Sequence, residues 1–163
     1  MDIGTSVTAI LIVIACIIPF VIMNKINARR ERQFLQPLFN LAEHHQSRLS
    51  QYDTWSHSAI GIDHTNGIVF FFKKINNIET SREIRLSAIK KCRVIHVSKT
   101  VNDGQENFKG IARLTLAFEH LDNTKADELL EFYNADSDGE SLTGELQLVE
   151  KWRHLIDNKM NPK

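Results

Sequence analysis

Residues 60–74 read IGIDHTNGIVFFFKK, and this stretch decides the fold of the chain. Residues 59–63 alternate between apolar and small or polar positions, which is typical of a short strand. Asn66 and Gly67 both accept a positive φ, so together they form a strong hairpin signal. Residues 68–72 are apolar at every position, which indicates a strand that is buried on both faces. The stretch therefore predicts an antiparallel hairpin whose second strand is central in a sheet.

Further strands are predicted on the C-terminal side of this hairpin. The clearest covers residues 111–119, where apolar residues alternate with Arg113, Thr115 and Glu119. A sheet with one buried face requires this alternation. The same period predicts strands over residues 83–86, 92–101 and 127–134, although the last of these also fits a helix.

The chain closes with a predicted amphipathic helix over residues 141–157. Its apolar residues recur at a spacing of three or four, and they are Leu142, Leu146, Val149, Trp152 and Ile156. Ser141 or Thr143 is a candidate cap for its first turn, and Glu145 complements the positive end of the helix. We expect this helix to cover the open end of a bent sheet.

The N-terminal part holds an uninterrupted apolar run, residues 7–23, that carries no charged side chain. Extended back to Gly4 it reaches about 20 residues, enough for a helix to cross a ~30 Å hydrocarbon core. We therefore predict a transmembrane helix over residues 4–23. Positive flanks stay on the cytoplasmic side, and the basic residues that follow are Lys25, Arg29, Arg30 and Arg32. This predicts a single-pass protein of a bacterial inner membrane, with its N-terminus outside and its C-terminal domain in the cytoplasm.

Other interpretations of the apolar run fit less well. A cleaved signal peptide requires a basic front end and a small-residue cleavage site, and neither is present. Residues 13–16, Val-Ile-Ala-Cys, have the residue types of a bacterial lipobox, in which Cys16 is acylated. The run continues beyond Cys16, which argues against that site, but lipidation of Cys16 stays an open alternative. A buried core helix conflicts with a run that is apolar on every helical face.

A basic, amphipathic connector is predicted for residues 24–53. Apolar residues at helical spacing indicate a helix, which Pro37 divides into two segments. This connector either packs on the following domain or lies on the inner leaflet with its arginines at the lipid headgroups. The folded domain then covers residues 54–158, and residues 159–163 form a tail.

Composition argues against several classes of function. The chain has 163 residues with 20 basic and 20 acidic side chains, so its net charge is zero, whereas a dedicated nucleic-acid binder is normally basic. Its two cysteines, one of them inside the apolar run, cannot form a disulfide framework. Cys92 lies in a predicted strand and is interpreted as a small buried hydrophobic residue.

The order of these segments resembles a pleckstrin-homology-like (PH-like) domain, as found in small bacterial proteins with one N-terminal transmembrane helix. The resemblance covers about residues 55–157 and rests on IGIDHTNGIVFFFKK, EIRLSAIKKCRVI, ARLTLAFEH, LLEFYNAD and GELQLVEKWRHLI. It implies an α+β fold that is mainly β, an antiparallel β-barrel or bent sheet capped by the C-terminal amphipathic helix. It also implies a binding module without catalysis, although a fold alone does not establish a function.

A basic segment supplies the first candidate site. PH-like domains that bind lipids gather cations near the first hairpin and the turn after it, and the matching residues here are Lys73, Lys74, Arg82 and Arg85. Near an anionic leaflet each such residue adds about 1 kcal/mol of attraction. The alternative, which we favour, is that these residues are ordinary solvated strand ends.

An acidic loop supplies the second candidate site. Residues 134–145 have almost the spacing of an EF-hand calcium loop, and its ligands would be Asn134, Asp136, Asp138 and Glu145. Asn replaces the usual Asp at the first position, the hydrophobic residue expected at the eighth is missing, and no second hand accompanies the loop. A solvated acidic turn before a helix is therefore the preferred interpretation.

No motif of an enzyme is visible in the sequence. The chain lacks H-E-x-x-H, G-x-S-x-G, P-loop and G-x-G-x-x-G sequences, and its histidines have no ligand spacing. We therefore predict no catalysis and no cofactor. The predicted function is a membrane-tethered cytoplasmic binding or scaffold module that docks a protein or peptide. A reader of anionic lipid headgroups is the first alternative, and a calcium-binding loop is the second.

Overall fold

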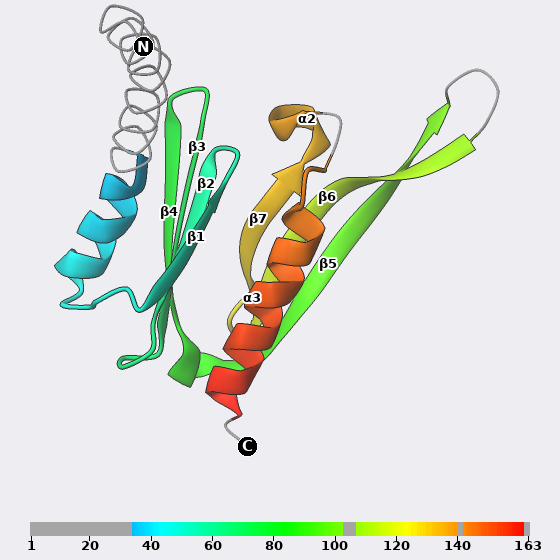
Figure 1. Cartoon of the computed structure of the whole chain (residues 1–163). Coiled ribbons are helices and arrows are strands. Elements are labelled where there is room, and N and C mark those ends of the chain that lie inside the picture. The colour runs from blue at the N-terminus through cyan, green and yellow to red at the C-terminus, as the bar shows by residue number, and fades with distance from the viewer. Residues whose placement is uncertain (1–33, 103–106, 140–141, 162–163) are drawn as a thin grey trace, which may run out of the picture. The chain divides into compact units, whose positions relative to one another are not determined.

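The computed structural model describes residues 34–102, 107–139 and 142–161 (Figure 1). The chain divides into two compact units, Met1–Pro37 and Leu38–Lys163. The strands and helices named below belong to the second unit, except that the helical residues 34–44 begin in the first.

Two antiparallel sheets form the second unit, a four-stranded sheet in the order β1-β2-β3-β4 and a three-stranded sheet in the order β5-β6-β7. The first sheet contains β1 (Gln51–Trp55), β2 (Ser58–Asp63), β3 (Ile68–Ile75) and β4 (Ile78–Arg85). A 3-10 turn, η1 (Leu86–Ala88), leads to β5 (Ile89–Asn102), β6 (Asn107–His120) and β7 (Glu128–Asn134). The chain ends in a short helix, α2 (Ala135–Asp138), and a long one, α3 (Glu145–Met160).

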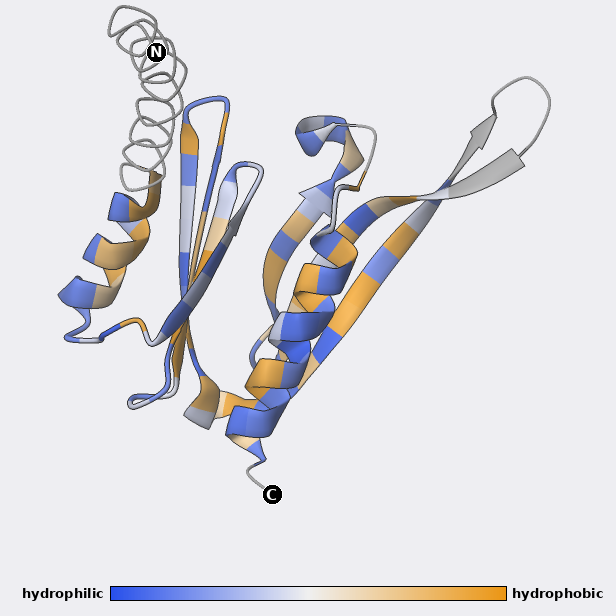
Figure 2. Cartoon of the chain, viewed as in Figure 1, coloured by the Kyte–Doolittle hydropathy of each residue, from blue (hydrophilic) through white to orange (hydrophobic). Residues whose placement is uncertain are grey.

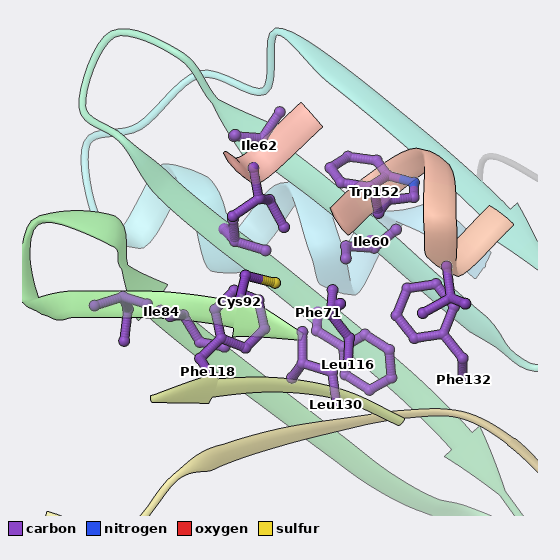
Figure 3. Packing of buried hydrophobic residues seen from close by; sticks show 14 of the residues in the cluster. Ile60, Ile62, Phe71, Ile84, Cys92, Leu116, Phe118, Leu130, Phe132 and Trp152 are labelled. Atoms are coloured by element: carbon purple, nitrogen blue, oxygen red, sulfur yellow. The ribbon is translucent and has the colours of Figure 1, made fainter. Parts of the chain in front are cut away.

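The main core lies where the two sheets and α3 meet. The first sheet contributes Ile60 and Phe71, the second contributes Leu116, and α3 contributes Val149, Trp152 and Ile156. Trp152 is fully buried, and Figure 3 shows it beside Ile60. Hydropathy alternates along α3 with the helical period (Figure 2). Val149, Trp152 and Ile156 of the predicted apolar face pack inward, whereas Leu146 is exposed.

The outer face of the four-stranded sheet is buried as well. Phe70 and Phe72 point to this face and are inaccessible to solvent, as are Leu38 and Ala42 from the helical residues before β1. The ring of His45 lies 6.0 Å from the ring of Phe70. Helical residues 38–44 therefore cover this face, which explains why residues 68–72 are apolar at every position.

The first helix ends earlier than the sequence predicts. Gln46 has φ 53°, and the N–H groups of Gln46 and Ser47 donate to the carbonyls of Glu43 and Ala42. These paired bonds form a Schellman motif with Gln46 in the left-handed position, where glycine is usual. The helix stops there, and residues 51–55 form β1 instead of the last turn of the predicted connector.

The turns at Asn66–Gly67 and Asn76–Asn77 lie where the sequence predicts them, but the first is longer than a two-residue hairpin turn. The β2–β3 connection is a four-residue loop in which only Gly67 has a positive φ, and the Gly67 N–H donates to the Asp63 carbonyl. The two-residue hairpin turn is found between β3 and β4, where Asn76 and Asn77 have φ values of 49° and 64°. Asparagine tolerates the left-handed region well enough to form this turn without glycine.

The predicted fold class requires correction. The chain is mainly β with helices, but its described strands form two separate sheets that no strand pairing joins, so the predicted closed barrel or single bent sheet is wrong. The number of sheets depends on which strands pair with each other, and local sequence patterns carry little information on strand pairing.

The predicted transmembrane helix requires correction as well. Among the residues that the structure describes, none of the helices is both long and apolar enough to cross a membrane. Residues 4–23 lie outside the described residues, as do Lys25, Arg29, Arg30 and Arg32. The single-pass placement in an inner membrane, and with it the cytoplasmic location of the C-terminal domain, is withdrawn.

Candidate functional site

Lys73, the first of the predicted lipid-binding cations, is buried in a salt-bridge network. Its Nζ lies 2.9 Å from Asp138 Oδ2 and 3.1 Å from Glu131 Oε1. The side chains of Lys73 and Asp138 are only 7% and 4% exposed. Lys73 therefore fastens β3 to β7 and α2, and its charge is not presented to a ligand.

The other three predicted cations do not gather into one site. Lys74 pairs with Glu79, and Arg85 pairs with Glu83, both on the same sheet. The register of β3 and β4 places Lys74 next to the Asn76–Asn77 turn and Arg85 at the opposite end of the strand pair. Arg82 is exposed and donates to the neighbouring Ser81 carbonyl. These residues lie along β3 and β4 without forming a pocket for a headgroup.

The acidic loop is held by contacts within the protein. Asn134 caps α2 by accepting from the Asp136 N–H, while the Asn134 N–H donates to Asp138 Oδ2. The carboxylate of Glu145 accepts from the N–H and hydroxyl of Thr143. Among the described residues, no group of three or more acidic, histidine or cysteine side chains could hold a metal ion. Asn134, Glu145 and one oxygen of Asp138 thus have partners within the protein, while the second oxygen of Asp138, Oδ1, is buried without one.

Glu145 also changes the predicted start of α3. The N-cap residue is Gly144, which has φ 130° and no side chain to cap the helix. Glu145 instead reaches back to Thr143, so the predicted capping by Thr143 is replaced by the reverse contact. Ser141, the other candidate cap, lies outside the described residues.

Cys92 is inert as a nucleophile. It is buried in the main core. Burial raises the pKa of its thiol to about 12, and the nearby Asp157 carboxylate acts in the same direction. The basic neighbours of Cys92 in the sequence point away from the core and do not activate it.

The strand edges are further places where the fold can bind a partner. Two of the four edge strands make contacts with other elements: Asp53 of β1 accepts from Lys151 and Trp152 of α3, and the Phe132 carbonyl of β7 accepts from Trp55. The third, β4, carries acidic and basic side chains in turn along its length. The fourth edge strand is β5.

The β5 edge is long and open. β5 has 14 residues and pairs only with β6. Together the two strands extend beyond α3 and β7 as a hairpin (Figure 1). Among the described residues, no backbone hydrogen bond reaches residues 90–99 from the side away from β6. This edge therefore offers a row of unpaired N–H and C=O groups.

The charged side chains of β5 are all basic. They are Lys90, Lys91, Arg93 and Lys99, and all four are exposed. Lys90 pairs with Glu119 of β6, and Arg93 pairs with Asp127 just before β7. Within the described part of the chain, Lys91 and Lys99 have no acidic partner. The β5 edge thus carries two positive charges that no acidic side chain among the described residues balances.

The sequence showed part of this site. The basic bias of residues 73–99 is visible in the sequence, and the lysines and arginine of β5 belong to it. The bias alone did not distinguish β3 and β4 from β5, because the order of strands in the sheets determines which residues lie on an open edge.

Comparison of the chain with protein-family models, with curated proteins and with solved structures finds no match. The resemblance to PH-like domains is therefore not tested by these comparisons and stays a prediction.

Proposed function

We propose that this protein is a non-catalytic binding module that takes up an extended, acidic segment of a partner protein along β5. The observation that carries this proposal is the open β5 edge, whose charged side chains are all basic and two of which are unbalanced. The absence of an enzyme motif from the sequence is consistent with a role in binding alone.

Backbone pairing would supply the affinity of such a complex. An extended peptide that adds to a sheet edge forms main-chain hydrogen bonds at every second residue, and its alternate side chains face opposite sides of the sheet. β5 is already paired with β6 from Ile89 to Asn102, with irregularities in the register after Ile89 and after Val97. The edge is therefore ordered before the partner binds, which lowers the entropy cost of association.

Charge would select the partner. Lys91 and Lys99 are exposed and unbalanced, so they attract carboxylates on an added strand and repel cations. An exposed ion pair contributes only about 0.2–1 kcal/mol, so the two lysines set the preference for acidic segments while the backbone provides most of the binding energy.

The test uses the purified full-length protein and two fluorescent ten-residue probes, one of alternating Glu and Thr and one of alternating Lys and Thr. We expect the acidic probe to bind and the basic probe not to bind. Reversing both charges, Lys91→Glu with Lys99→Glu, replaces two attractions by repulsions and weakens binding by roughly 5–30-fold. The matched control is Lys159→Glu, which changes an exposed lysine in the last turn of α3. This lysine lines a hollow with Ile89 and Lys90 at the start of β5 and is not itself part of the β5 edge.

A second experiment tests the strand pairing itself. Two forms of the acidic probe carry N-methyl groups on alternate amides, one set in each form. Because only every second N–H of an added strand faces β5, one methylated form binds like the parent and the other does not. Equal binding of the two forms, or no binding of the parent probe, contradicts the proposal.

A further inference from the structure

We infer that a groove beside the β2–β3 loop binds a small organic dianion that carries phosphate or carboxylate groups. The groove consists of two hollows, one of about 510 Å³ and one of about 400 Å³. Asn66, from the β2–β3 loop, and Ser87, from η1, line both hollows, so the two are neighbours. We call them together the loop groove. This inference does not depend on the binding of a partner along β5.

All ionisable side chains that line the loop groove are basic or histidine. Lys90 and Lys159 line the larger hollow, and His45 and Arg85 line the smaller one. No aspartate or glutamate belongs to the lining of either hollow. The cations thus stand at the two ends of the groove, with the uncharged Asn66 and Ser87 between them, which suits a ligand with a negative charge at each end.

The acidic partners of these cations are Glu119 and Glu83, and neither lines the loop groove. Glu119 pairs with Lys90 at 2.7 Å, and Glu83 pairs with both Arg85 and His45. The Lys90–Glu119 pair is the more exposed of the two, at 54% and 33%, and exposed pairs contribute little to stability. A ligand anion can therefore replace Glu119 at small cost. Glu83 is 19% exposed and keeps its pair with His45, while Arg85 is 67% exposed and open to a ligand.

Two further sources of negative charge lie near the groove, the Asp63 carboxylate and the C-terminal end of α3, and each is offset by groups of the protein. Asp63, beneath the β2–β3 loop, accepts hydrogen bonds from the N–H groups of Arg48, Thr65 and Asn66, so its charge is satisfied internally. The carboxyl end of α3, with its partial negative charge, also borders the larger hollow. Lys159 lies in the last turn of α3 and has no ion pair among the described residues, so its charge offsets that end of the helix and stays open to a ligand.

The uncharged lining fits an organic ligand rather than a bare ion. Leu86, Ile89, Leu121 and Met160 line the larger hollow, whose volume falls in the range of about 300–1,000 Å³ that is usual for small-molecule sites. Ser87 contributes a hydroxyl group that makes no hydrogen bond within the described part of the chain. The apolar side chains would contact the body of the ligand, and the hydroxyl would donate to one of its anionic groups.

The test is isothermal titration of the full-length protein at low salt with three probes, pyrophosphate, citrate and ADP. We expect saturable one-to-one binding of at least one probe. Binding of pyrophosphate or ADP alone identifies a phosphate ligand, and binding of citrate alone identifies a carboxylate ligand. Lys159→Gln removes one charge-assisted hydrogen bond and is expected to weaken the bound probe about tenfold.

The matched control is Lys99→Gln, an exposed lysine of the β5 hairpin that does not line the loop groove, and it is expected to leave probe binding unchanged. The inference is overturned if no probe shows saturable binding, or if both variants weaken binding equally, since that result indicates diffuse attraction. The same two lysines exchange roles in the peptide experiment, so failure of one proposal is distinguishable from failure of the other.

Discussion

Replacing Lys73 by methionine is expected to lower the free energy of unfolding by about 3–5 kcal/mol, because it leaves a buried carboxylate without its cation. Lys73 Nζ lies 2.9 Å from Asp138, whose side chain is 4% exposed and whose second oxygen, Oδ1, already lacks a hydrogen-bond partner. Methionine fills nearly the same volume as lysine, so the loss measures the charge and not a cavity. Glu131 is more exposed and keeps its pair with Arg113, so Asp138 accounts for most of the cost.

The neighbouring lysine provides the control for this prediction. Lys74 pairs with Glu79 at 2.8 Å, but these side chains are 43% and 50% exposed. Lys74→Met is therefore expected to cost at most about 1 kcal/mol. Urea unfolding, followed by the fluorescence of Trp55 and Trp152, measures both variants, since both indole rings pack against the core and report its loss.

A double variant separates the charge from other effects. Lys73→Met with Asp138→Asn removes the unpaired charge and keeps an acceptor for the Asn134 N–H, so it is expected to recover at least half of the stability lost in Lys73→Met. The reasoning is refuted if Lys73→Met and Lys74→Met cost the same, or if the second substitution adds to the loss of the first.

Three further predictions follow from buried or strained groups. Because burial raises the pKa of Cys92 to about 12, a Cys16→Ser variant should not react with a thiol reagent at pH 8 until urea unfolds it. Asp63→Asn should cost roughly 1.5–3 kcal/mol, since the Asp63 carboxylate accepts three backbone N–H groups. Burial alone would raise the pKa of Asp63, but these bonds outweigh it and hold the pKa below its ordinary 3.8. The stabilisation is therefore present above that value and lost as the pH falls through the folded pKa, so urea titrations of wild type and Asp63→Asn should converge in acid. Gln46→Gly should raise stability by about 0.5–1 kcal/mol in the same assay, because Gln46 holds a left-handed φ of 53°.

Local patterns predicted the strands and the final helix well, and they failed where distant residues decide. Residues 111–119 alternate cleanly and form the later part of β6, and the apolar run at 68–72 forms the first five residues of β3. The division into two sheets depends on which strands pair, and β4 and β5 are separated only by η1. The composition of η1 does not predict that the chain passes from one sheet to the other at this turn.

The roles of the charged residues were also hard to predict from the sequence, because they depend on contacts between distant parts of the chain. Lys73 has the sequence environment of a solvated strand end, yet its partners, Glu131 and Asp138, are more than fifty residues away in the chain. Sequence alone offered Lys73 either as a solvated strand end or as a lipid-binding residue, whereas the fold buries it in a salt-bridge network. Conversely, Lys91 and Lys99 belong to the basic segment visible in the sequence but were not predicted as site residues, because their importance depends on the open edge of β5.

An open strand edge can pair with the proposed partner but also with unwanted chains, and the lysines of β5 favour the first over the second. A strand of 14 residues with unpaired backbone groups is a template for pairing with any extended chain, including a second β5. Antiparallel pairing of two β5 edges would bring the unbalanced Lys91 and Lys99 of one copy near the basic side chains of the other, and like charges across strands are destabilising. The same charges favour a strand that carries carboxylates. A single feature, an edge with bases and no acids, thus disfavours self-association and leaves the edge available to the acidic partner that we propose.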